Sequence, residues 1–342
     1  MTILVIRFSS LGDVAIAAHV VAALRQQYPQ VKVVFLTKKQ FRPVLSTLDI
    51  TVETPDLMQY KGFSGLGKLA KQLSDKYGFE RVFDLHGVLR SWILDFWFVL
   101  KGKKVFVIDK GKREKRQLVR RHRKKIKKLK HTAARYANVF TRGGLSIDLN
   151  NYRPNFGFIL QNSAKRFLDD RKINIGIAPF AAHRSKEYPP ELMREVLRLL
   201  DETGKFNILI FGGGKRERQI AEQWQEEFPS AKSVIGQLDM QQEIALIGAL
   251  SLMVTMDSGN MHLASLTGTK TITIWGGTHP HLGFTPFKNF DPQLAIQKDL
   301  PCRPCSVFGT DKCYRGDFAC LRIEPEVIFQ KIVKATQMSE IE

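Results

Sequence analysis

The chain has 342 residues, 44% of them hydrophobic, which is long enough for two domains that each bury a core. Its formal net charge of +20 indicates anionic binding partners and carries no information about the fold. Arg7 interrupts the first apolar run and no cleavage pattern follows, so a signal peptide is not expected. The longest apolar stretch, residues 92–100, is too short to cross a bilayer, and these features together predict a soluble, cytoplasmic protein.

The first half of the chain alternates short β-rich runs with segments of helical periodicity. Strands are expected at residues 3–6, 31–36, 51–53, 81–84 and 105–108. Helices are expected at residues 14–25, 68–76, 91–100 and 132–140. This alternation predicts a mostly parallel sheet covered by helices.

The turn after the first strand carries the first candidate for chemistry. It reads Ser9-Ser10-Leu11-Gly12-Asp13, and Asp13 opens the following helix. A carboxylate there either stabilises the helix start or takes a proton from a hydroxyl nucleophile. The turn lacks G-x-G-x-x-G and the chain lacks a Walker pattern, which argues against a dinucleotide site and a P-loop.

A basic segment, residues 110–131, interrupts the pattern. It contains thirteen Lys or Arg and one acidic residue, Glu114. Such a segment fits nucleic acid, an anionic membrane surface or a polyanionic substrate, or is a solvated loop with no specific partner. No aromatic residues are interleaved with the charges, so a nucleic-acid partner is not expected. The prediction is peripheral attachment to anionic lipid at the inner membrane.

A linker is expected at residues 150–158, which divides the chain into domains 1–155 and 156–342. The second half repeats the α/β pattern and ends in a C-terminal helix. Its strands are expected at residues 173–177, 207–211, 233–235 and 271–275, with a further apolar run at 247–254. Its helices are expected at residues 191–200, 216–224, 240–250 and from 261 onward. Two such halves are expected to form a cleft between the carboxyl ends of their sheets.

Several turns of the second half follow strands and could hold an anion. Asp257-Ser258-Gly259 precedes a helix, whose amino terminus either is simply capped or binds a phosphate. Lys186 lies in a loop between a strand and a helix, and Glu217 follows a Gly-Gly-Gly turn. Glu217 could bind a ribose or only favour the helix dipole.

All four cysteines lie near the end, with the spacing C-x2-C-x7-C-x6-C. In a cytoplasmic protein this spacing indicates a structural metal site, zinc or an iron–sulfur cluster, while reduced thiols and disulfides are the alternatives. The candidate ligands are Cys302, Cys305, Cys313 and Cys320.

Taken together, the motifs resemble glycosyltransferase family 9, the lipopolysaccharide heptosyltransferase family. The resemblance spans nearly the whole chain in family order. It is carried by ILVIRFSSLGDV at residues 3–14, Lys186 with Tyr188-Pro189 in place of Lys-x-Trp-Pro, Phe211-Gly212-Gly213 with Glu217, Asp257-Ser258-Gly259 with His262, and Cys302-Arg303-Pro304-Cys305.

The resemblance implies a GT-B fold and an inverting transfer of heptose from ADP-heptose to a lipid A–Kdo acceptor, with no metal in the chemistry. It implies that Asp13 is the general base and that Lys186 neutralises the departing diphosphate. The implied donor-binding residues are Ala181, Ala182, Lys186, Glu217, Leu238, Asp257, Ser258, Gly259 and His262. The expected acceptor-binding residues are Ser10, Gly12, Arg120, Arg121 and Arg123.

Three points depart from the family pattern or stay open. Ala181-Ala182 stands where many members have Thr or Ser, so phosphate contacts would fall to backbone amides or to residues 183–185. His262 either orients the phosphate loop or is a core histidine bonded to backbone. The alternatives to heptose transfer are a transferase for another nucleotide sugar and a nucleic-acid-binding protein acting through the basic segment.

Overall fold

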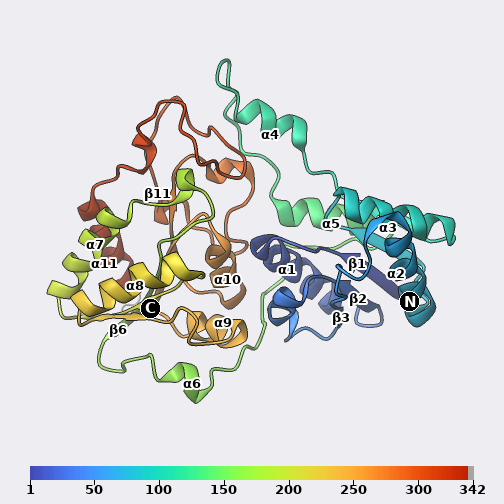
Figure 1. The fold of residues 1–342 in the computed structure, drawn as a ribbon, viewed down its shortest axis with the longest axis horizontal. Coiled ribbons are helices and arrows are strands. Elements are labelled where there is room, and N and C mark those ends of the chain that lie inside the picture. Colours follow the sequence, from blue (N-terminus) through green and yellow to red (C-terminus); the bar gives the residue numbers. More distant parts are fainter. Residues whose placement is uncertain (338–342) are drawn as a thin grey trace. The chain divides into compact units, whose positions relative to one another are not determined.

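The computed structural model describes residues 1–337; residues 338–342, the end of the predicted second domain, lie outside them. The chain forms two compact units. The first consists of Met1–Lys112 and Lys130–Phe156, and the second of Arg113–Leu129 and the chain from Gly157 onward (Figure 1). The boundary thus falls after Phe156, one residue beyond the predicted one. Most of the basic segment belongs to the second unit, whereas the sequence assigned it to the first.

The first unit is built on a five-stranded parallel sheet with the strand order β3-β2-β1-β4-β5. Its strands are β1 (Thr2–Ile6), β2 (Lys32–Leu36), β3 (Thr51–Glu53), β4 (Arg81–Asp84) and β5 (Lys104–Val107). Its helices are α1 (Leu11–Gln27), η1 (Lys39–Leu45), α2 (Gly62–Tyr77), α3 (Leu89–Leu100) and α5 (Thr132–Arg142). The central strand β1 is buried on both faces, which explains its continuous apolar sequence.

The second unit contains a six-stranded parallel sheet with the order β11-β10-β9-β6-β7-β8. Its strands are β6 (Ile173–Ala178), β7 (Phe206–Ile210), β8 (Ala231–Ser233), β9 (Leu252–Met256), β10 (Thr271–Trp275) and β11 (Ala295–Gln297). Its helices are α4 (Lys112–Leu118), α6 (Asn162–Lys165), η2 (Arg184–Lys186), α7 (Pro190–Glu202), α8 (Lys215–Glu227), α9 (Met240–Gly248), α10 (Gly259–Thr267), η3 (Pro280–Leu282), η4 (Pro292–Leu294), η5 (Ala319–Leu321) and α11 (Pro325–Gln337).

Most predicted elements are confirmed within a few residues, including the C-terminal helix. Three boundaries were wrong: α2 starts at Gly62 rather than Lys68, β8 ends at Ser233, where the predicted strand began, and α10 starts at Gly259 rather than Met261. The short helix α4 inside the basic segment and strand β11 were not expected. No helix among residues 1–337 combines the length and apolarity needed to cross a bilayer.

Helix α3 packs with α2 on one face of the first sheet and buries an acid there. Asp95 is 7% exposed. Burial, and then the neighbouring Asp84 carboxylate, raise the pKa of Asp95 to about 9. Asp84 itself accepts hydrogen bonds from the Ser91 hydroxyl (2.7 Å) and the His86 N–H (2.7 Å). Asp95 is therefore protonated at neutral pH.

This raised pKa predicts that the Asp95→Asn variant is more stable than the wild type at pH 8. Between about pH 4 and 9 the native state holds a proton that the unfolded chain has lost, so the free energy of unfolding falls as pH rises, by up to about 1.4 kcal/mol per unit. The variant lacks this loss. Thermal melts from pH 4 to 9 test it, with the exposed Asp75→Asn as control; parallel curves for wild type and Asp95→Asn would contradict it.

Candidate active site

Asp13 lies at the carboxyl edge of the first sheet, in the first turn of α1. Its Oδ2 accepts hydrogen bonds from the Ser10 hydroxyl (2.9 Å) and the Ser10 N–H (3.3 Å). This reciprocal contact between the N-cap and the third helical residue is a capping box. Gly12, next to Asp13, is buried. Asp13 thus stabilises the start of α1, one of its two predicted roles. Its predicted role as a base stays a prediction.

Arg7 was not among the predicted site residues, yet it is the main partner of Asp13. It is buried, forms an ion pair with Asp13 Oδ2, and donates to the carbonyl of Leu85 (2.7 Å). Pairing of β1 with β4 brings Leu85 there. Although burial lowers the pKa of Arg7, Tyr136 and Asp13 raise it above its ordinary value. The Tyr136 hydroxyl donates to Asp13 Oδ1 at 3.4 Å. Both oxygens of the carboxylate are therefore held in fixed directions.

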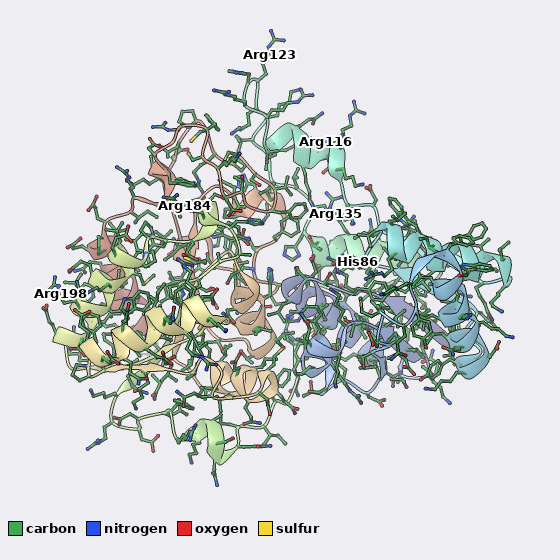
Figure 2. All side chains as sticks on the ribbon, viewed as in Figure 1. His86, Arg116, Arg123, Arg135, Arg184 and Arg198 are labelled. Atoms are coloured by element: carbon green, nitrogen blue, oxygen red, sulfur yellow. The ribbon has the colours of Figure 1, made fainter. Side chains whose placement is uncertain are left out.

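Two further basic groups stand at this edge. His86 follows β4. Its side chain, labelled in Figure 2, packs edge-on against Phe8 at 5.7 Å between ring centres. Burial, then the charges of Arg7 and Lys110, lower the pKa of His86 to about 3, so His86 is neutral. Burial and Arg7 also lower the pKa of Lys110. The surroundings of Asp13 are thus cationic and suit an anionic or hydroxyl-bearing ligand.

The second unit brings Lys186 and Asp257 together. Their strands, β6 and β9, are paired side by side, so the loops that follow them emerge at one edge of the sheet. Lys186 Nζ lies 3.2 Å from Asp257 Oδ2, and both side chains are largely buried. The hydroxyl of Thr278, which follows β10, donates to the same oxygen at 2.7 Å. The Asp257 carboxylate therefore fixes the position of the Lys186 ammonium, and the predicted contact of Asp257 with the donor stays a prediction.

Helix α10 begins at Gly259, two residues after Asp257. Ser258 is its N-cap residue, in an extended conformation, but its side chain makes no capping hydrogen bond. Its hydroxyl instead lies 3.4 Å from that of Thr255. Because the Ser258 side chain does not cap the helix, the first N–H groups of α10 are suited to an anion. His262 is buried inside α10, and its two alternative roles both stay predictions.

The loop that carries Lys186 is hydrogen-bonded to the segment between Cys305 and Cys313. Ser185 donates its N–H to the carbonyl of Thr310 (3.0 Å), and the Thr310 N–H donates back to the Ser185 hydroxyl (2.8 Å). A Cβ at Gly309 would stand 2.7 Å from the Lys186 side chain, so the two segments touch. The predicted phosphate-binding amide of Ala181 donates to Glu187 (3.2 Å). The contacts of Ala182 with a phosphate stay a prediction.

Glu217 and Leu238 follow the second and third strands of this unit in chain order. Glu217 accepts a hydrogen bond from the Gly213 N–H (2.6 Å), which closes the glycine turn after β7. Burial raises the pKa of Glu217, and this hydrogen bond opposes the shift. Leu238 is half-buried, before the N-cap Asp239 of α9. Both residues lie at the carboxyl edge of the second sheet, where a nucleoside could reach them. Their contacts with a nucleoside stay a prediction.

The basic arm, Arg113–Leu129, packs on the second unit. Lys124 Nζ donates to the carbonyls of Cys302 (2.7 Å) and Pro304 (2.8 Å). Arg121 stacks on Tyr314 at 4.8 Å, and Arg123 points outward at the tip of the arm (Figure 2). The expected acceptor residues Arg120, Arg121 and Arg123 therefore belong to a different unit from Ser10 and Gly12.

The four cysteines are free thiols. Burial raises the pKa of Cys305, and the neighbouring thiols of Cys302 and Cys313 add to the shift, so these thiols lie near one another. Within residues 1–337, however, no group of three or more His, Cys, Asp or Glu side chains is arranged to hold a metal ion. Disulfides are not present among these thiols, and the metal site stays a prediction.

Residues 66–310 match the family model described as glycosyltransferase family 9 (heptosyltransferase). The lipopolysaccharide core heptosyltransferase OpsX of Haemophilus influenzae is 26% identical over 307 residues, 86% of this chain and 84% of that protein. A lipooligosaccharide heptosyltransferase 2 of Campylobacter jejuni is 23% identical over 334 residues, 95% of this chain and 96% of that protein.

Solved structures of low identity share the fold. A glycosyl transferase family 9 protein from Veillonella parvula has a TM-score of 0.74 at 19% identity and covers 98% of this chain and 97% of its own. The ADP-heptose lipopolysaccharide heptosyltransferase II of E. coli has a TM-score of 0.70 at 18% identity, with 99% and 100% covered. This likeness confirms the predicted GT-B fold class.

Proposed function

Because the chain belongs to glycosyltransferase family 9 (heptosyltransferase) and is therefore a glycosyltransferase, we propose that it transfers heptose from ADP-heptose to a lipopolysaccharide core acceptor. The observation that carries this proposal is the Lys186–Asp257–Thr278 arrangement beside the uncapped amino terminus of α10. A fixed cation next to the first backbone N–H groups of a helix suits a diphosphate, which is the leaving group of a nucleotide sugar.

In the proposed reaction the second unit binds the donor. The bond between the anomeric carbon and the β-phosphate oxygen breaks, and negative charge develops on the departing ADP. Lys186, held by Asp257, stabilises that charge without reorganising during the step. The amides at Ser258 and Gly259 bind the phosphate oxygens, and Glu217 holds the ribose of the adenosine.

The first unit supplies the base. The acceptor hydroxyl loses its proton to Asp13 as its oxygen bonds to the anomeric carbon, which inverts the configuration there. Arg7 and Tyr136 fix the carboxylate so that it faces one direction. The cationic surroundings formed by Arg7 and Lys110 suit an acceptor that carries acidic groups, as the Kdo sugars of the inner core do.

We propose no metal for this chemistry, since Lys186 and the helix terminus take the role that a cation plays elsewhere. A structural zinc at the four cysteines is a separate proposal, supported by their spacing and mutual proximity. Metal analysis of the purified protein tests it, and a stable, active preparation without stoichiometric zinc would reject it.

The proposed donor is tested by thermal shift and transfer assays with ADP-, UDP- and GDP-sugars. ADP-heptose is expected to give the largest stabilisation, because binding to the native state alone raises the melting temperature. Transfer to a Kdo-containing acceptor should follow with ADP-heptose only. Preference for a uridine or guanosine donor would replace the ADP assignment with the alternative of another nucleotide sugar.

A further inference from the structure

Helix α3 leaves one face uncovered although it is apolar on nearly all sides. Its buried face carries Leu94 and Phe98 against the first sheet. The opposite side exposes a stripe of large apolar side chains at helical spacing. This α3 stripe consists of Leu89 (71% exposed), Trp92 (48%), Phe96 (48%), Val99 (56%) and Leu100 (62%). Within a water-soluble unit a contiguous stripe of this kind marks an interaction surface.

Aromatic side chains widen the stripe toward α2. Phe63 of α2 is half exposed, and its ring lies 5.4 Å from Phe96 and 5.0 Å from Trp97, between centres. The indole N–H of Trp97 donates to the carbonyl of Phe63 (3.0 Å), which ties the two helices at this point. The result is a preformed aromatic platform rather than a set of isolated exposed residues.

The charges around the stripe are positive. Arg90 lies in α3, and Lys101 and Lys104 follow its end; all three are exposed. Lys112 stands over the Trp92 ring at 6.0 Å. The one acid within α3, Asp95, is buried and protonated as described above. An apolar, aromatic face with a cationic rim and no ionised acid on the helix complements the headgroup region of an anionic bilayer.

We propose that the α3 stripe is the surface by which this protein docks onto anionic lipid, with Trp92 and Phe96 inserted at the interface. A second copy of the chain is the less suitable occupant, since a symmetric contact would bring the two cationic rims together. The basic arm is also less suitable as the principal anchor, because Lys115, Arg121 and Lys124 are engaged with the second unit.

The place of the stripe in the fold agrees with this assignment. It begins at Leu89, shortly after the β4 terminus that supplies Leu85 and His86 beside Arg7 and Asp13. Docking through α3 therefore holds the carboxyl edge of the first sheet close to the lipid. Only this last point rests on the proposed function, in which the acceptor is lipid-linked; lipid binding itself does not.

The test is vesicle co-sedimentation of the full chain with phosphatidylcholine, with and without phosphatidylglycerol. The Trp92→Ser/Phe96→Ser/Val99→Ser variant is expected to lose binding to the anionic vesicles by about tenfold or more. The matched control is Ile159→Ser/Phe308→Ser/Val327→Ser, which removes exposed apolar side chains elsewhere and should bind as the wild type does. A melting temperature for each variant excludes loss of folding as the cause.

A second measurement places the contact. Brominated lipid should quench the fluorescence of the wild type through Trp92 and the half-buried Trp97, because Trp224 and Trp275 are buried. Trp92→Phe should remove the share of that quenching that comes from Trp92, and Trp92→Phe/Trp97→Phe should remove most of it. The proposal is overturned if the stripe variant binds vesicles normally. It is also overturned if Lys125→Gln/Lys127→Gln/Lys128→Gln alone abolishes binding, or if the stripe variant only converts a dimer to a monomer. Transfer to a delipidated acceptor, which the stripe variant should retain, separates this result from failure of the proposed function.

Discussion

The Asp13→Asn variant is expected to lose about 10²–10⁴-fold in kcat, because an amide cannot take the proton of the acceptor hydroxyl. Affinity for the donor should stay within about twofold of the wild type, since the donor binds through the second unit. Asparagine keeps the size of the side chain and can still accept from Ser10, so the start of α1 should survive. Single-turnover kinetics and donor titration separate the two effects.

Asp49→Asn is the matched control for this experiment. Asp49 also pairs with an arginine of the first unit, Arg25, but its side chain is exposed. Loss of such a surface pair changes stability by about 0–1 kcal/mol and should leave turnover intact. Near-normal turnover in Asp13→Asn would show that Asp13 is a capping and ion-pairing residue and that another group is the base.

The Lys186→Ala variant is expected to lower kcat by about 10²–10³-fold, the size seen when one fixed group facing developing charge is removed. It should also weaken ADP binding while adenosine, which has no phosphates, binds unchanged. Calorimetry with the two ligands measures this difference. Equal weakening for both ligands would mean that Lys186 shapes the pocket rather than binding the diphosphate.

Asp257 offers a sharper test of the same arrangement. If Asp257 acts by holding Lys186, the losses in Asp257→Asn and Lys186→Ala should not add in the double variant. Lys331→Ala is the control, because Lys331 lies in the same unit and its ammonium donates to a backbone carbonyl, that of Gln293 (3.0 Å). Additive losses would indicate two independent roles.

The sequence predicted strands well where apolar runs are bounded by turns. It could not predict which strands are neighbours, and this order decides the site. Lys186 meets Asp257 because β6 and β9 are adjacent, although β7 and β8 lie between them in sequence. Local periodicity carries no information on such pairing, so from the sequence Asp257 was interpreted as part of the turn before α10 and as a donor-binding residue, and its contact with Lys186 was not revealed.

Arg7 and Tyr136 were missed for a related reason. Arg7 was noticed only as a charge that interrupts an apolar run, whereas its burial depends on a carbonyl supplied by β4. A charged residue at the end of an otherwise buried strand was the available signal. Tyr136 fits the apolar pattern of α5, and nothing in that pattern reveals that its hydroxyl reaches Asp13. The basic arm was interpreted from its composition alone, and composition does not show that it packs against Cys302, Pro304 and Tyr314.

The basic arm also decides how the molecule can be cut and recombined. The second unit is completed by Arg113–Leu129, so the chain passes between the units after Lys112, Leu129 and Phe156. A fragment that begins at Gly157 lacks Lys124, the donor to the carbonyls of Cys302 and Pro304, and leaves Tyr314 uncovered. During synthesis this arm is made long before the residues it packs against, Cys302, Pro304 and Tyr314. The second unit of a relative therefore cannot be exchanged by a single cut at the linker. A chimera must replace both Arg113–Leu129 and the chain from Gly157 onward.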